Sequence, residues 1–225
     1  MYEWNFAPVF ASAGLLAQGL LNTLKVTAVA LVLGLIIGLA LALLRLSPRR
    51  YLSWPAGFVI EVFRTTPPLV QLFWFFFALP LIAGIEMTPF AAAVVTFSIQ
   101  SAAFFAEVFR AGIQSIDRGQ WEGALAIGML RAQALRRIVL PQAVTRMIPA
   151  FLERSIELMK TTTLVATIAY ADLLYQANAI AQRTYRPLET FTVAALIYFV
   201  VIFAFSLLAR RVERRLAVGG DTTVH

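Results

Sequence analysis

Cysteine is absent from this 225-residue sequence, and histidine occurs once, at the final residue, His225. The absence of cysteine excludes disulfides, thiolate nucleophiles and cysteine-ligated metal centres. A lone terminal histidine also argues against histidine-based catalysis. Charged residues are scarce at 14%, whereas hydrophobic residues make up 60%. Because soluble domains carry about 25% charged residues, this composition indicates a membrane protein.

Four charge-free runs are long enough to cross a membrane as helices. A spanning helix needs about 20 apolar residues, and the runs cover residues 26–44, 65–85, 87–106 and 190–209. We expect the first run to extend upstream over residues 14–25, with its early part near the membrane interface. Pro67 and Pro68 predict a kink or a broken turn at the start of the second run.

A fifth hydrophobic segment, residues 148–170, contains the charged residues Glu153, Arg154, Glu157 and Lys160. Each charge at the centre of a bilayer costs roughly 3 kcal/mol, so these groups must pair, face other protein or face water. At 100° per residue, Glu153, Glu157 and Lys160 fall within an arc of about 60°. We therefore expect one polar stripe on this helix, with Arg154 to its side.

The arginines gather in alternate loops of this topology. They follow the first span, fill the segment between residues 106 and 148, and follow the last span: Arg45, Arg49, Arg50, Arg110, Arg118, Arg131, Arg136, Arg137, Arg146, Arg210, Arg211, Arg214 and Arg215. The opposite loops hold only Arg183 and Arg186. The positive-inside rule then predicts an extracytoplasmic N-terminus and a cytoplasmic C-terminus, which is consistent with an odd number of five spans. This asymmetry accounts for the net charge of +7 without nucleic acid.

The stretch EGALAIGMLRAQALRRIVLP, residues 122–141, belongs to the one sizeable cytoplasmic loop, residues 110–146. Glycine costs about 1 kcal/mol inside a helix and permits a left-handed turn, so Gly128 predicts two short helices with a break between them. Pro141 is expected to stop or kink the second helix. An apolar helix exposed to water usually marks an interface. Alternatively, the segment lies on the headgroups with its arginines on anionic lipid.

The spacing in this stretch resembles the EAA motif of importer permeases in the ATP-binding-cassette (ABC) superfamily. That motif reads E-A-A, three residues, G, nine residues, I, one residue, L-P. Its positions are occupied here by Glu122, Gly123, Ala124, Gly128, Ile138, Leu140 and Pro141, with Gly123 in place of the first alanine. Residues 19–47, 61–80, 106–129 and 157–174 also look like the polar amino-acid uptake permeases of bacteria.

The resemblance implies an all-α polytopic membrane protein of the type I importer class, with five transmembrane helices and a cytoplasmic helix-turn-helix coupling loop. In that family the loop docks in a groove of an ATPase, so Trp121 and the motif residues, with Leu125, Ile127 and Met129, are expected to contact that partner. The other implied partners are a second permease subunit (identical or related), two cytoplasmic ATPase subunits and an extracytoplasmic amino-acid-binding protein. The implied location is the bacterial inner membrane.

No enzyme activity and no bound cofactor or metal are expected for this chain. ATP and Mg²⁺ would bind to the partner ATPase. Consistent with this, the sequence lacks the G-x-x-x-x-G-K-[ST] motif that cradles nucleotide phosphates.

The candidate substrate-pathway residues are the polar groups of the predicted spans: Arg64, Gln71, Gln100, Glu153, Glu157, Lys160 and Thr161. For the charges of the fifth segment, the alternatives are an ion pair between Glu157 and Lys160, three residues apart, or contact with water at the cytoplasmic end. Arg64 could instead be an interface anchor paired with Glu61. The glutamines could form interhelical hydrogen bonds.

The acidic stripe favours a cationic or zwitterionic substrate. Glu107 and Arg110 are expected to pair where the third span leaves the membrane.

We predict one transmembrane domain over residues 19–215, after an extracytoplasmic or interfacial segment, residues 1–18, and before a cytoplasmic tail, residues 216–225. The predicted function is the transmembrane subunit of an ATP-driven importer for a polar amino acid, working by alternating access. The alternatives are an ion-coupled secondary transporter or channel, a permease for an amino-acid-like zwitterion such as a compatible solute, and a membrane scaffold. Five spans without an inverted repeat argue against a secondary transporter.

Overall fold

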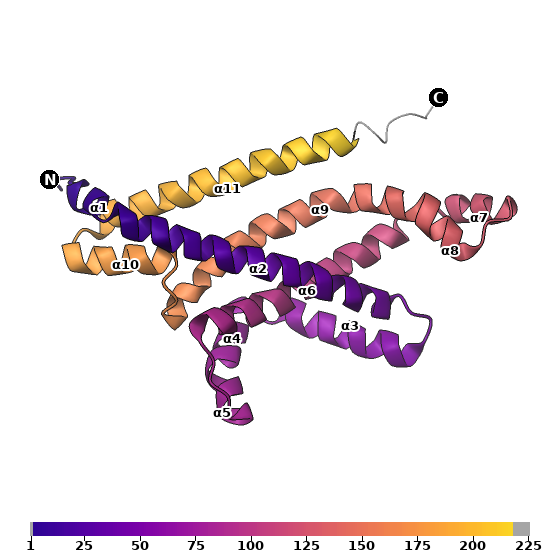
Figure 1. Ribbon diagram of the computed structural model, residues 1–225, viewed down its shortest axis with the longest axis horizontal. Helices are drawn as coiled ribbons and strands as arrows, with labels where there is room; N and C mark the ends of the chain where they lie inside the picture. The colour runs from indigo at the N-terminus through magenta and orange to yellow at the C-terminus, as the bar shows by residue number, and fades with distance from the viewer. Residues whose placement is uncertain (1, 218–225) are drawn as a thin grey trace.

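The computed structural model describes residues 2–217, and all regular structure in that range is helical (Figure 1). A short helix, α1 (Ala7–Ala11), precedes the long helix α2 (Ala13–Arg45). Three helices are long and apolar enough to cross a membrane: α2, α6 (Pro89–Gln114) and residues Pro187–Arg211 of α11 (Pro187–Ala217). Two bent helix pairs bring the number of spans to five if each pair is one span. Residues 218–225, with His225 and most of the predicted tail, lie outside the described residues.

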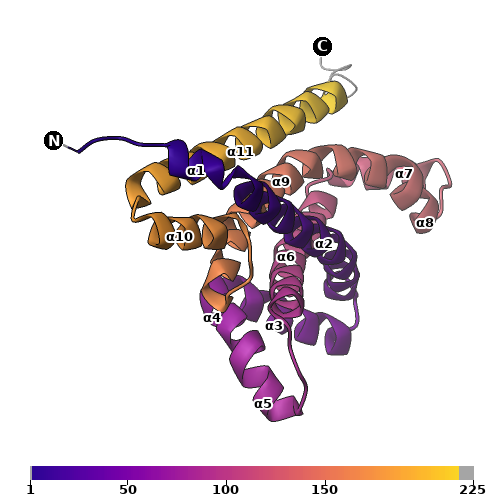
Figure 2. The same cartoon turned by 60° about the vertical axis from the view of Figure 1, so that its left-hand side comes forward.

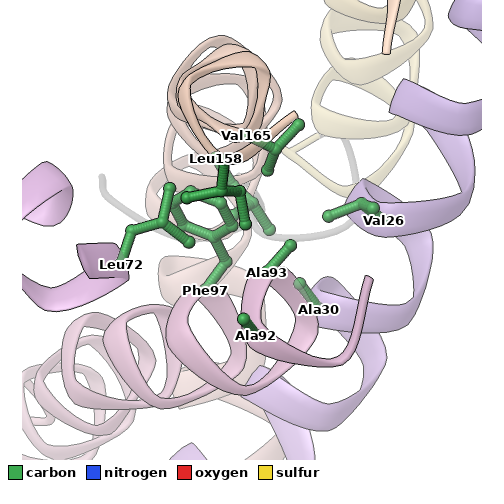
Figure 3. Packing of buried hydrophobic residues seen from close by; sticks show 9 residues of the cluster. Val26, Ala30, Leu72, Ala92, Ala93, Phe97, Leu158 and Val165 are labelled. Atoms are coloured by element: carbon green, nitrogen blue, oxygen red, sulfur yellow. The ribbon is translucent and has the colours of Figure 1, made fainter. Parts of the chain in front are cut away.

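The core forms where α2 and α6 lie side by side. A Cβ added at Gly34 would lie 2.8 Å from Ser101 Cβ, and one at Gly38 would lie 2.8 Å from the Ala102 carbonyl oxygen. Small residues four apart therefore let the two backbones approach closely, as in helix pairs within membranes. The other helices pack around this pair, and Figure 3 shows Phe97 of α6 beside residues from neighbouring helices. The core cluster comprises Val26, Ala30, Leu72, Ala92, Ala93, Phe97, Leu158, Val165 and Ile168.

The second hydrophobic run is broken where the prolines predicted a break. Helix α3 (Arg50–Thr65) ends before Thr66 and Pro67, which are both extended, and α4 (Pro68–Phe73) leaves at 105°. Each of the two residues precedes a proline, whose ring disfavours helical geometry in its predecessor. The run continues through a π-helical turn (Trp74–Ala78) into α5 (Leu79–Ala83). Helix α3 was not expected, because its single apolar face gives no charge-free run.

Pro141 does not stop the second helix of the loop, so the predicted stop was wrong, while the predicted kink stays a prediction. Helix α8 (Arg131–Ala134) passes through a π-helical turn (Leu135–Val139) directly into α9 (Leu140–Thr161). A proline has no N–H to donate, and its ring clashes with the carbonyl four residues earlier. A π turn widens the helix and removes that conflict. Pro80 likewise follows the π turn of the second run.

The predicted fifth segment is formed by α9 and a 3-10 continuation (Thr162–Ile168). The chain then turns at Ala169, which is left-handed, and enters the short helix α10 (Leu173–Thr184). Asp172 caps α10, since its Oδ1 accepts a hydrogen bond from the Tyr175 N–H at 2.8 Å. Figure 2 shows α10 near α1 and the start of α11. The N-terminal segment is tied there, because the Asn5 N–H donates to the buried Glu189 carboxylate at 3.0 Å.

Candidate functional site

The predicted coupling loop forms two helices with a break at Gly128. Helix α7 (Arg118–Ala126) starts at Asp117, whose Oδ1 accepts a hydrogen bond from the Gly119 N–H at 2.6 Å. Gly128 has φ +83° and donates its N–H to the Leu125 carbonyl oxygen at 3.0 Å. A left-handed residue at this place closes the helix and turns the chain toward α8. The predicted helix-break-helix is therefore confirmed.

The outer side of this loop is apolar and exposed. Ile127 and Leu130 are 77% and 69% exposed, and Leu125 is also exposed. We call these three residues the apolar tip. Leu125 and Ile127 were among the predicted contact residues, whereas Leu130 was not. Monomeric proteins seldom expose such groups together without a partner.

The motif residues divide between the outer and inner sides of the loop. Ala124 is buried, and Trp121 packs partly buried against a cluster of Ile116, Val139, Ala143 and Met147. Trp121 and Ala124 therefore hold α7 against the protein, and Ile138 is half-buried. The exposed motif residues are Glu122, Gly123, Gly128, Leu140 and Pro141.

A cavity of about 220 Å³ lies where the end of α3 meets α6 and α9. It brings together four predicted pathway residues: Arg64, Gln100, Glu157 and Thr161. We call it the central cleft. Arg154 was not among the predicted pathway residues, but it lines the cleft. Its guanidinium lies 4.6 Å from the centre of the Phe104 ring. The Arg64 guanidinium lies 5.8 Å from the centre of the same ring.

The charges in the central cleft are unevenly paired. Arg154 Nη1 lies 2.5 Å from Glu157 Oε2, whereas Arg64 Nη1 is 3.9 Å from Glu61 Oε2. The Arg64 Nε is buried and has no hydrogen-bond partner among the described atoms. A buried donor without a partner costs about 1–3 kcal/mol, which marks Arg64 as ready to bind an acceptor.

The predicted polar stripe forms on α9, where Glu153, Glu157 and Lys160 are all exposed, but it does not line the cleft as a whole. Glu153 and Lys160 are exposed and do not line the cleft, and Glu157 pairs with Arg154 instead of Lys160. Helical spacing allows a partner three residues away in either direction. Arg154 is favoured because it can lie over the Phe104 ring of α6, a contact between helices that spacing along one helix does not reveal.

Gln71 has a structural position. It is buried, and its Nε2 donates to the carbonyl oxygens of Phe63 at 3.0 Å and Thr66 at 2.9 Å. These bonds satisfy acceptors at the broken end of α3. The hydrogen-bonding alternative for Gln71 therefore matches the structure.

A second cavity of about 380 Å³ is lined by Arg64, Glu107, Arg146 and Arg154, among others, and so adjoins the central cleft. Arg146 lies near the loop and donates to the Ser115 carbonyl oxygen at 2.5 Å. The predicted pair of Glu107 with Arg110 is confirmed, with Arg110 Nε 3.0 Å from Glu107 Oε2. Polar groups thus continue from Thr161 toward the loop end of the protein.

Comparison with known proteins gives a consistent set of relatives. Residues 30–218 match the family model described as "Binding-protein-dependent transport system inner membrane component". The chain is 36% identical to the arginine transport system permease protein ArtQ of Bacillus subtilis, over 94% of this chain and 97% of that protein. It is 38% identical to the glutamate/aspartate import permease protein GltK of Escherichia coli O157:H7, over 96% of this chain and 100% of that protein.

Solved structures agree with these relatives. A crystal structure of an amino acid ABC transporter with histidines matches with a TM-score of 0.91 and 38% identity, over 95% of this chain and 100% of that chain. An inward-facing structure of the MetNI methionine ABC transporter matches with a TM-score of 0.77 at 21% identity, over 92% of this chain and 98% of that chain. The second likeness shows a shared fold.

Proposed function

Because the chain belongs to the family of binding-protein-dependent transport system inner membrane components, we propose that its exposed loop couples a partner ATPase to the central cleft. The chain is the inner-membrane permease of an ABC importer for polar amino acids, and it is the transport component rather than the ATPase. This assignment takes the place of the secondary transporter, channel and scaffold alternatives.

The apolar tip is the observation that carries the coupling proposal. Leu125, Ile127 and Leu130 project from the loop, and burying such side chains in a groove gives roughly 1.5–3 kcal/mol each. Glu122 is exposed beside them and can pair at the rim of that groove. Trp121 and Ala124 serve from the inner side by holding α7 in place.

The remaining assignments concern assembly and orientation. Two ATPase subunits, a binding protein and a second permease, identical or related, complete the importer. The N-terminus is extracytoplasmic and the C-terminus cytoplasmic, because the basic ends of α2 and α11 lie at the same end of the protein as α7 and α8 (Figure 1). The transmembrane domain covers residues 19–215, after an extracytoplasmic segment, residues 1–18.

The central cleft is the proposed place of substrate passage. Its volume of about 220 Å³ is below the range of about 300–1,000 Å³ typical for drug-sized ligands, which suits a free amino acid. Arg64 binds the α-carboxylate through its unpartnered Nε edge, and Glu157 binds the ammonium group by exchanging Arg154 for it. Both ends of a zwitterion are then satisfied. Glu153 and Lys160 are not part of this proposal because they lie outside the cleft.

Arg64→Gln is expected to raise the KM for amino-acid uptake about 10- to 100-fold, because a hydrogen bond to a charged group contributes about 1.5–3 kcal/mol. Substrate-dependent uptake into proteoliposomes measures the change. The matched control is Glu61→Gln, which removes the ion-pair partner of Arg64 on an exposed surface. If Glu61→Gln raised KM equally, Arg64 would be an interface anchor and the substrate role would be wrong.

Purification in mild detergent tests the coupling itself. The permease is expected to carry two ATPase subunits, and loaded binding protein is expected to stimulate ATP hydrolysis several-fold. Proteoliposomes with permease alone should show no uphill uptake, because the driving force is the partner's ATP cycle. Uphill uptake by the permease alone would overturn the proposal.

A further inference from the structure

The turn between α2 and α3 encloses a basic cavity that the transport cycle above does not use. It has a volume of about 700 Å³ and is lined by Arg45, Arg50, Tyr51, Ser53, Trp54 and Pro55. Arg45 is the last residue of α2, a membrane-spanning helix, and Arg50 is the first residue of α3. The turn therefore lies where a spanning helix leaves the membrane (Figure 1).

Arg45 is held in a fixed position in this cavity. Its Nη1 donates to the Ser53 carbonyl oxygen at 3.1 Å, and the Ser53 hydroxyl donates to the Arg45 carbonyl oxygen at 2.9 Å. The guanidinium also rests against Gly57, since a Cβ there would lie 2.8 Å from both Cζ and Nη1. A guanidinium positioned in this way keeps its remaining N–H groups available for an anion.

The carboxylate on which the charge of Arg45 acts, Glu107 of α6, is already paired with Arg110. The sequence has no acidic residue between Glu3 and Glu61, and the ion pairs of the described residues do not include Arg45, Arg49 or Arg50. Like charges held together repel unless a counter-ion binds between them. These exposed arginines can therefore accept a negative charge from outside the chain.

The surroundings of the cavity indicate where that charge comes from. Trp54 is 73% exposed and Tyr51 is 68% exposed, and the Trp54 ring stacks on exposed Phe58 with centroids 6.1 Å apart. Aromatic side chains of this kind lie at the headgroup level of a membrane, with their apolar parts toward the acyl chains. Exposed aromatic rings do not contribute to binding a small hydrated anion, so they favour a lipid headgroup over a free anion.

We propose that this cavity binds the phosphate of an anionic phospholipid headgroup. Arg45 and Arg50 contact the phosphate oxygens, and Trp54 and Tyr51 contact the glycerol and upper acyl region. Two charge-assisted contacts on one phosphate make the site selective for anionic lipid over zwitterionic lipid.

Gly57→Ala tests this without changing any charge. The new methyl group displaces the far end of the Arg45 side chain, so retention of phosphatidylglycerol by the purified importer complex should fall about fivefold or more, as measured by native mass spectrometry. Phosphatidylcholine retention should be unchanged. The control is Gly14→Ala, because a Cβ at Gly14 would meet nothing within 4 Å. Equal retention in the two variants would overturn the proposal.

A second pair of variants separates this cavity from general attraction to a basic surface. Arg45→Gln with Arg50→Gln should lose phosphatidylglycerol, whereas Arg210→Gln with Arg211→Gln, which removes the same charge at the end of α11, should retain it. Equal loss in both would show a diffuse effect and contradict the site. Inorganic phosphate at millimolar concentration should not displace the lipid; displacement would assign the site to free phosphate instead.

Discussion

Gly128→Pro is expected to reduce ATP-driven amino-acid uptake about 100-fold or more, to background. Gly128 has φ +83°, which proline cannot adopt because its ring fixes φ near −65°. The substitution also removes the N–H that Gly128 donates to Leu125. The break between α7 and α8 would be rebuilt at a cost of about 3 kcal/mol, and the apolar tip would be re-aimed. Uptake into proteoliposomes and binding-protein-stimulated ATP hydrolysis measure the loss.

Gly84→Pro is the matched control. Gly84 also has positive φ, also has open space around it, and also donates its N–H within its own helix end, to Pro80. The same backbone disturbance is thus placed after α5, away from the loop. We expect normal membrane insertion of both variants and substantial uptake by Gly84→Pro. Normal uptake by Gly128→Pro, or equal loss in both, would contradict the coupling role of the loop.

Gly38→Leu is expected to destabilise the folded permease by about 3 kcal/mol, at the upper end of the overpacking range. The first carbon of the new side chain would lie 2.8 Å from the Ala102 carbonyl oxygen and 2.9 Å from Phe105 Cβ. The carbonyl oxygen belongs to the backbone and cannot rotate away, so α2 and α6 would have to separate. The melting temperature in detergent should fall by roughly 10 °C.

Gly14→Leu provides the comparison within the same helix. No atom lies within 4 Å of a Cβ at Gly14, so the melting temperature should change little. Both variants add the same apolar side chain, which separates packing from hydrophobicity. A similar melting temperature for the two variants would show that the α2–α6 contact is not the limiting part of the core.

The spans could be predicted because a helix that crosses a membrane needs a long, continuous apolar run, which is visible in the sequence. The runs ending near Leu44 and Ala106 became α2 and α6, and the two prolines marked the bend after α3. Helix α3 was missed because its buried residues, Ala56 and Ile60, are separated by exposed ones. The close approach at Gly34 and Gly38 was also missed, since it depends on which face of α6 lies opposite.

The loop could be predicted from the sequence, whereas the cleft could not. The loop is local in sequence, so the spacing from Glu122 to Pro141 predicted its two helices and the break between them. The cleft is assembled from α3, α6 and α9, and the arc of charges on one helix could not show that Phe104 of another helix draws Arg154 inward. Charges pair according to their tertiary neighbours, which no single helix specifies.

The π turn before Pro141 has a mechanical consequence. Because it lets α8 run into α9 without a loop residue, one continuous helix extends from Arg131 to Thr161, roughly 45 Å along its path at about 1.5 Å per residue. One end of this helix follows the loop that carries the apolar tip, and Arg154 and Glu157 lie near the other end. A flexible loop between α8 and α9 would reduce the movement that α8 passes to α9. Without one, a tilt at the loop end is carried along one continuous helix to the ion pair in the cleft.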